Sequence, residues 1–155
     1  MAWDSLAPYL PDVTLQPIDP QTLGAPRGYS HGMLARAGGR LLFVAGQTAR
    51  DGEGNLHGGS QAEEWEQSLR NVAEVVRAAG GGIRDIGRLT IYVTDRADYL
   101  ANLTSIGRAY RRVMGDHYPA MALVEVKGLV DEGATVEIEA TAVIPESDED
   151  PEPEP

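Results

Sequence analysis

Two glutamates, Glu137 and Glu139, are the residues best suited to acid–base chemistry, and they stand two positions apart in an alternating segment. A β-strand with this spacing carries both carboxylates on one face, beside Thr141 and Val143, and leaves its other face apolar. A carboxylate in a partly desolvated cleft suits general acid or base work near neutral pH. Because this face mixes apolar groups with carboxylates, we expect a subunit interface that encloses polar pockets, and hence an oligomer.

Several other chemistries are excluded by the residue types. The sequence has no cysteine, which removes disulfides, thiolate metal sites and cysteine nucleophiles. His31, His57 and His117 lack the spacing of metal ligands, so we expect no metal. The glycines at 80–82 follow a helical pattern instead of opening one, and no Gly-x-Ser-x-Gly motif is present, so neither a phosphate loop nor a serine hydrolase is indicated.

Six strands are predicted to position the candidate residues. Residues 13–18 form an edge strand because of Pro17, and residues 31–37 and 40–45 flank Gly38-Gly39, a hairpin signal. The apolar run at 41–44 predicts a central strand. Further strands are expected at 88–94, 121–127 and 135–143, and we place Met121 and Leu123 on the same mixed face as the glutamates.

Two helices are predicted between these strands. Ser60 and Glu63 form a capping box ahead of an apolar stripe that includes Trp65 and ends at Gly80. Asp95 caps a second helix that ends at Gly115. The element order predicts an α/β fold, a two-layer sandwich of a mixed six-stranded sheet with two helices on one face.

Length and charge narrow the partners. A chain of 155 residues, 42% hydrophobic and 24% charged, is typical of one globular domain without a membrane span. The formal net charge is −11, and without the six carboxylates of residues 146–155 it is still −5, so we expect no nucleic-acid partner. A small-molecule partner and a cytoplasmic location are the expectations that remain.

The chain is predicted to have three parts. Residues 1–12 contain two prolines and form an N-terminal arm, residues 13–145 form the domain, and residues 146–155 alternate acids with proline and form a disordered acidic tail.

Eight short segments, in order, resemble the Rid (YjgF-type, reactive intermediate deaminase) family. They are Gly28-Tyr-Ser-His31, Leu42-Phe-Val-Ala-Gly-Gln47 with the helical Gln67-Ser-Leu-Arg-Asn-Val72, Ala79-Gly-Gly81, Leu89-Thr-Ile-Tyr-Val-Thr-Asp95, Tyr118-Pro-Ala120, Val124-Glu-Val126 and Val136-Glu-Ile-Glu-Ala140. The resemblance implies a chorismate-mutase-like fold and a homotrimer, with clefts between neighbouring subunits. It also implies hydrolysis of small enamines or imines, such as 2-aminoacrylate, to keto acids and ammonia without a cofactor.

Four positions depart from the pattern of this family. Its deaminase motif has an arginine that grips the substrate carboxylate where this chain has Met121, and a thioether offers neither charge nor donors. Leu123 replaces a small residue or a thiol, Ala45 a serine, and Gly107 an asparagine. Met121 and Leu123 either line a pocket for a less charged ligand or pack in the interface.

Four candidate residues match the family or remain polar. Glu137 resembles the glutamate that positions water, although an ion pair with an arginine across the interface is the alternative, and Glu139 is taken as structural. Tyr29 resembles a tyrosine of the cleft, or is an ordinary interface aromatic. His31 exchanges protons in the cleft, or is solvated or bonded to the backbone. Gln47 touches substrate, or satisfies backbone groups at the end of a strand.

These residues favour a Rid-like hydrolase or deaminase, acting on small imines or enamines with a shifted substrate preference. Glu137 and Tyr29 are then the catalytic residues, and the small-molecule substrate lies at the subunit interface. The alternative is a non-catalytic trimer of the same fold that binds a small molecule or regulates another protein, because fold does not determine function.

Overall fold

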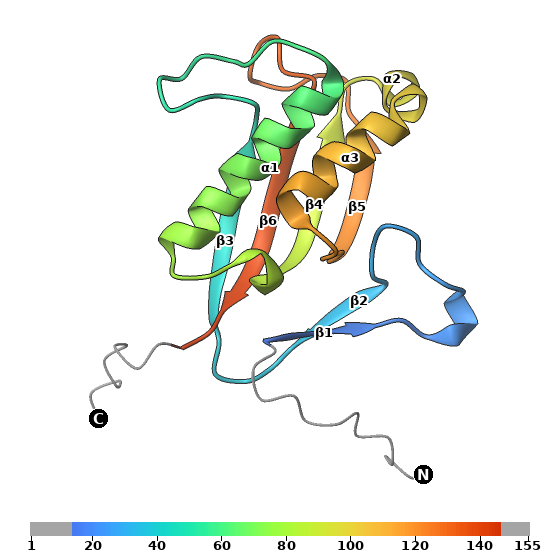
Figure 1. Ribbon diagram of the computed structural model, residues 1–155, viewed down its shortest axis with the longest axis vertical. Helices are drawn as coiled ribbons and strands as arrows, with labels where there is room; N and C mark the ends of the chain where they lie inside the picture. The colour runs from blue at the N-terminus through green and yellow to red at the C-terminus, as the bar shows by residue number, and fades with distance from the viewer. Residues whose placement is uncertain (1–13, 147–155) are drawn as a thin grey trace.

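The computed structural model describes residues 14–146, and they form an α/β sandwich in which helices cover one face of a sheet (Figure 1). The predicted arm (1–12) and all but the first residue of the predicted tail (146–155) lie outside the described residues. The strands are β1 (Leu15–Ile18), β2 (Gly32–Ala35), β3 (Arg40–Gln47), β4 (Ile86–Val93), β5 (Ala120–Glu125) and β6 (Val136–Ile144). The helices are α1 (Gln61–Ala78), α2 (Arg96–Ala101) and α3 (Leu103–Met114), with short 3₁₀ turns η1 (Gln21–Leu23) and η2 (Ile83–Asp85).

The six strands form two sheets, so the prediction of one six-stranded sheet is wrong. The main sheet has the order β3-β6-β4-β5; β4 and β5 run parallel, and the other neighbours run antiparallel. β1 and β2 pair only with each other, as a separate ribbon below the main sheet (Figure 1). The ribbon is joined to the sheet near β5, where Ser30 donates from its backbone to Pro119 and from its hydroxyl to Tyr118.

The predicted hairpin at Gly38-Gly39 is also wrong. β2 pairs with β1 and β3 pairs with β6, so these glycines connect two sheets instead of two paired strands. Gly38 has a φ of 93°, which suits a sharp change of direction. β3 therefore lies at an edge of the main sheet and is not central. Its apolar run is explained by the uncovered sheet face, where Leu41 and Phe43 are 59% and 75% exposed.

Both predicted helix starts are confirmed, but the second predicted helix is two helices. The Ser60 hydroxyl accepts from the backbone of Glu63, whose carboxylate accepts from the backbone of Ser60. Asp95 accepts from the backbone of Asp98. The chain breaks between α2 and α3 at Asn102, where the side-chain amide donates to the carbonyl of Asp98 and competes with helix continuation.

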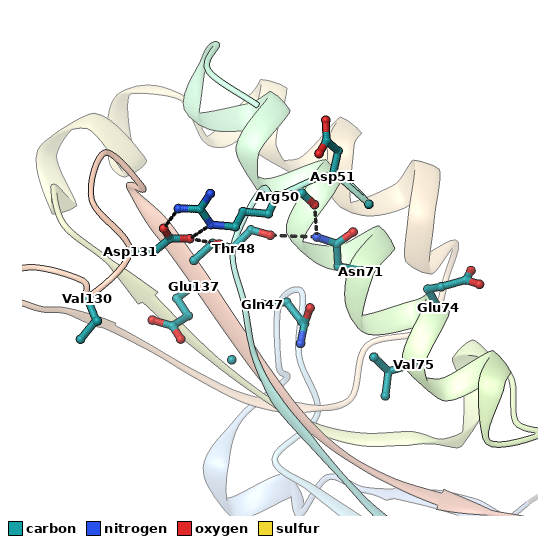
Figure 2. Close-up of a pocket in the computed structure, with 12 residues that line it drawn as sticks. Gln47, Thr48, Arg50, Asp51, Asn71, Glu74, Val75, Val130, Asp131 and Glu137 are labelled. Carbon is teal, nitrogen blue, oxygen red and sulfur yellow. Dashed lines mark hydrogen bonds and ion pairs between the residues drawn. The ribbon is translucent and has the colours of Figure 1, made fainter. Parts of the chain in front are cut away.

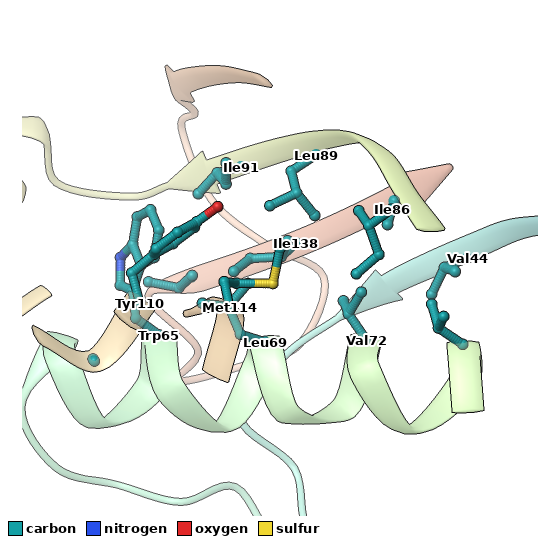
Figure 3. Packing of buried hydrophobic residues seen from close by; sticks show 14 of the residues in the cluster. Val44, Trp65, Leu69, Val72, Ile86, Leu89, Ile91, Tyr110, Met114 and Ile138 are labelled. Atoms are coloured by element: carbon teal, nitrogen blue, oxygen red, sulfur yellow. The ribbon is translucent and has the colours of Figure 1, made fainter. Parts of the chain in front are cut away.

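The hydrophobic core fills the layer between the helices and the main sheet (Figure 3). Leu69 and Val72 of α1 pack there with Leu89 and Ile91 of β4 and Ile138 of β6, each at most 1% exposed. No helix within residues 14–146 is long and apolar enough to cross a bilayer.

Candidate functional site

The main sheet separates the candidate residues by face. In β6, Glu137 and Glu139 point to the uncovered face, since their neighbours Val136 and Ile138 are buried under the helices. Met121 of β5 pairs in register with Leu89, which faces the core, so the placement of Met121 and Leu123 beside the glutamates is wrong. Both belong to the helix-covered face and pack against the core.

Glu137 lies in a pocket of about 680 Å³ at the β3 edge of the sheet (Figure 2). The end of β3, the outer side of α1 and the loop before β6 surround it. Its lining residues are Gly46, Gln47, Thr48, Arg50, Asp51, Gly52, Asn71, Glu74, Val75, Val130, Asp131 and Glu137. We call this cavity the β3-edge pocket. It combines a half-buried carboxylate, Glu137, with space for a small molecule.

A bulge in β3 makes room for the Glu137 side chain. Val44 pairs with Ala140 and Gln47 with Ile138, so β3 has one residue more than β6 between these pairs. Gly46 is one of the two residues within the bulge. A Cβ atom at Gly46 would lie only 2.8 Å from the carboxyl carbon of Glu137 and 3.0 Å from its Cγ. The absence of a side chain at Gly46 therefore sets where the Glu137 carboxylate lies.

An ion pair fixes the rim of the β3-edge pocket. Arg50 forms an ion pair with Asp131, in which Nε of Arg50 donates to the carboxylate at 2.7 Å. The Thr48 hydroxyl donates to the same carboxylate. The hydrogen bonds from Arg50 and then Thr48 lower the pKa of Asp131. On the other side of the chain, the Asn71 amide of α1 donates to the carbonyls of Thr48 and Arg50 at 2.9 and 2.7 Å. These contacts tie α1, the end of β3 and the loop before β6 together around Glu137.

No local pattern in the sequence predicts this group of rim residues. Asp131 is 81 positions from Arg50, and nothing in the local pattern connects the two. The sequence signal that existed was Asn71, which belongs to one of the segments resembling the Rid family.

Glu139 bonds to a tyrosine on the uncovered face. The Tyr92 hydroxyl donates to its carboxylate at 2.9 Å. This bond, burial and the negative charges of Glu139 and Glu137 raise the pKa of Tyr92. Glu139 has a structural partner in the neighbouring strand, whereas Glu137 is directed towards the β3-edge pocket.

A second pocket, of about 380 Å³, lies on the β5 side of the sheet beneath α2 and α3. It brings together four predicted residues, Tyr29, Gly107, Met121 and Leu123. The others that line it are Arg27, Gly28, Trp65, Ile91, Tyr99, Leu103, Ile106, Tyr110, Arg111 and Tyr118. We call it the β5-edge pocket. Its inner wall is largely aromatic: Tyr110 and Tyr118 stack at 5.3 Å, and Trp65 and Tyr99 at 5.7 Å.

The three remaining predicted residues have different positions. The His31 ring bonds to the carbonyl of Gly24 at 3.2 Å and meets Tyr29 edge-on, outside the lining of both pockets. Gln47 lines the β3-edge pocket, with its amide donating to the carbonyl of Ala45 at 3.2 Å. Ala45 is exposed in the bulge and lines neither of these two pockets.

The chain thus carries two separate pockets at opposite edges of its main sheet. The β3-edge pocket contains Glu137 and Gln47, and the β5-edge pocket contains Tyr29, Met121 and Leu123. No residue is shared between the two linings, so Glu137 does not reach the β5-edge pocket of its own copy.

Comparisons with known proteins agree with the fold and these motifs. Residues 20–144 match the profile of a family described as endoribonuclease L-PSP. The RutC family protein y4sK of Sinorhizobium fredii is 39% identical over 66% of this chain and 78% of its own. Human 2-iminobutanoate/2-iminopropanoate deaminase is 31% identical over 77% of this chain and 82% of its own. The crystal structure of the Rid protein YyfB from Yersinia pestis superposes with a TM-score of 0.75 at 33% identity, covering 84% of this chain and 99% of that one.

A mixed four-stranded sheet covered on one face by helices is the α/β fold that this chain shares with that Rid structure. The chain belongs to the Rid (YjgF-type) family.

Proposed function

We propose that this chain is a Rid-type hydrolase of small imines or enamines, with a substrate preference shifted away from short 2-imino acids. The observation that carries the proposal is the Glu137 carboxylate, seated over Gly46 at the β3 bulge and facing a pocket. The deaminases among its relatives, named for 2-iminobutanoate and 2-iminopropanoate, support the class of reaction.

In this reaction Glu137 orients a water molecule and accepts one of its protons. The water oxygen adds to the imine carbon, and the imine nitrogen takes up a proton from solvent. The carbon–nitrogen bond of the resulting carbinolamine then breaks, the proton held by Glu137 passes to the leaving ammonia, and the hydroxyl proton of the carbinolamine is released to solvent. One imine and one water give one carbonyl compound and one ammonia, with no change in oxidation state and no cofactor. Tyr29, at the β5-edge pocket, holds the substrate.

Completing the site requires a second copy of the chain. The β3-edge and β5-edge pockets are the two half-sites of this proposal, and they lie at opposite edges of the sheet. A neighbour would therefore present its β3 edge to the β5 edge of the first copy. Such a contact joins two different surfaces, and it closes into a ring if the rotation allows. We propose the homotrimer that the resemblance implies. The apolar groups on the uncovered face, Leu41, Phe43 and Val124, support burial of this face between copies.

The substrate shift follows from Met121. The β5-edge pocket has a thioether where a deaminase of this family has a carboxylate-binding arginine. Losing a charge-assisted pair of this kind reduces binding by a factor of at least about ten. Short 2-imino acids are therefore expected to be poor substrates compared with uncharged imines of similar size.

The test measures ammonia and carbonyl release from freshly generated imines in two sets, one of short 2-imino acids such as 2-iminopropanoate and one of uncharged imines of similar size. We expect faster turnover of the uncharged set, and loss of turnover in Glu137→Gln with an unchanged oligomeric mass. Glu132→Gln is the matched control, because Glu132 is exposed on the neighbouring loop, loses the same charge and lines neither half-site. Equal turnover by Glu137→Gln and the wild type would refute the role of Glu137.

A second candidate is a binding or regulatory trimer without turnover, favoured by the loss of polar groups at 45, 107, 121 and 123. Absence of turnover on both imine sets, in an intact oligomer, would select it. Ribonuclease activity, which the family description mentions, is disfavoured because a formal net charge of −11 repels an RNA backbone.

A further inference from the structure

The β5-edge pocket is positively charged within an acidic chain. Within residues 14–146, its lining includes two arginines, Arg27 and Arg111, and no aspartate or glutamate. The chain as a whole has a formal net charge of −11, and the β3-edge pocket is lined by four carboxylates and one arginine. A pocket with this charge attracts an anion.

Neither arginine has an acidic partner within residues 14–146, although five other arginines of this part of the chain pair with carboxylates: Arg50, Arg70, Arg77, Arg84 and Arg112. Within one copy of the chain, the guanidinium groups of Arg27 and Arg111 are therefore available to a ligand. Both residues are exposed, whereas Trp65, Ile106 and Tyr110 are at most 7% exposed, which places the charge at the mouth of the pocket and the aromatic groups at its inner wall.

Gly107 leaves open space beside the Arg111 guanidinium. The two residues are one turn apart on α3, and a Cβ atom at Gly107 would lie 3.9 Å from Nη2 of Arg111. A longer side chain at 107 would extend into the space beside the guanidinium. The β5-edge pocket thus has no positive charge on its strand side, at Met121. It has a positive charge on its helix side, at Arg111.

The inner wall of the pocket favours a flat ligand. Five aromatic side chains line it, and two pairs of them stack nearly parallel, with interplanar angles of 8° and 19°. Parallel ring faces and edges suit an aromatic ring, which gains from stacking beyond the burial of its area. A volume of about 380 Å³ fits one small ring system with a short substituent.

We infer that the β5-edge pocket binds an aromatic molecule carrying one anionic group, with Arg111 as the residue that binds the anion and Arg27 assisting it. The inference rests on the proposed function insofar as this ligand is the substrate or product of the hydrolase. It assigns specificity to a side chain on α3, and the anionic group lies at the mouth of the pocket, away from Met121.

Three unreactive probes test the ligand class: 3-phenylpropionate, its neutral analogue 3-phenylpropanamide, and propionate, which lacks the ring. Titration calorimetry on the full-length wild-type protein gives the dissociation constants. We expect 3-phenylpropionate to bind about tenfold more tightly than the amide, and propionate not to bind at concentrations that saturate the aromatic acid. Equal affinity for the acid and the amide, or no binding of either, would overturn the inference.

Arg111→Gln is expected to abolish the preference for the acid over the amide while leaving the affinity for the amide unchanged. Arg108→Gln is the matched control, because Arg108 is exposed on the same helix, loses the same charge and does not line the pocket. Gly107→Asn, which intrudes on the place of the guanidinium, is expected to act in the same direction as Arg111→Gln. A preference that survives in Arg111→Gln, or is lost equally in Arg108→Gln, contradicts the assignment.

These measurements separate the inference from the proposed function, because the probes undergo no hydrolysis. Binding of 3-phenylpropionate that depends on Arg111, in a protein inactive on every imine, supports the inference and refutes the hydrolase. Imine turnover in a protein whose affinity for 3-phenylpropionate is unchanged by Arg111→Gln supports the hydrolase and refutes the inference.

Discussion

Replacing Gly46 by alanine tests whether the β3 bulge positions the Glu137 carboxylate. The new methyl group would stand 2.8 Å from the carboxyl carbon, and ordinary contact begins at 3.4 Å. The carboxyl carbon must therefore retreat by at least the 0.6 Å between these two distances. The three nearest atoms all belong to the Glu137 side chain, so the backbone of β6 has no need to move.

A displacement of this size affects turnover more than stability. A catalytic group misplaced by about 1 Å costs on the order of 100-fold in rate, and we expect a loss of about ten- to 100-fold in kcat/KM for an uncharged imine. The free energy of unfolding should change by about 1 kcal/mol or less, since the glutamate is half-buried and rotates away, while alanine restricts the unfolded chain more than glycine does.

The assay combines imine turnover with urea unfolding. Gly87→Ala is the matched control, because its Cβ atom would meet Leu15 at an ordinary 3.4 Å and it lies in β4, away from both pockets. In a Glu137→Gln background, Gly46→Ala should cause no further loss, since the two changes act through one carboxylate. Full activity in Gly46→Ala, or an additive loss in the double variant, would refute this reasoning.

Three further outcomes are expected. Met121→Arg should raise turnover of 2-iminopropanoate relative to an uncharged imine by about tenfold or more; an unchanged ratio in a competition assay argues against the substrate shift. Phe43→Glu places a charge on the uncovered face, and sedimentation should then give the 16.6 kDa mass of a single chain, whereas a trimer that persists contradicts burial of this face. The Arg50 pair and the Thr48 bond depress the folded-state pKa of Asp131 below its ordinary 3.8, so their stabilisation is present above that value and is lost as pH falls through the folded pKa. The wild type and Asp131→Asn should therefore differ less in their free energy of unfolding in acid, as measured by urea denaturation. A difference that stays constant from pH 7 to pH 3 would contradict this prediction.

Local signals in the sequence predicted the helix starts and most strand positions. The Ser60 capping box and the Asp95 cap are confirmed because they involve groups three residues apart. The break at Asn102 was not predicted, because the apolar stripe continues through it. The partner of β2 was not predictable either, since a glycine pair specifies a turn and does not specify which strand pairs next.

The assignment of sheet faces failed where a strand is apolar on both sides. In β5, Met121 and Leu123 alternate with Ala122 and Val124, so period-two patterning cannot say which pair faces the helices. β6 has carboxylates on one side only, and there the prediction is confirmed. The motif residues could be located from the sequence, but their division between two edges depends on long-range pairing, as does the Arg50–Asp131 contact.

Because the site is divided between two sheet edges, mutations can change one half and leave the other half unchanged. Substitutions at the β5 edge change what is bound without touching the strand and bulge that hold Glu137, so ligand preference can drift while the water-activating half is inherited intact. In a ring of the proposed kind the halves also complement one another. Two chains, each defective at a different edge and both inactive alone, would restore about one complete cleft in four when mixed at random in equal amounts.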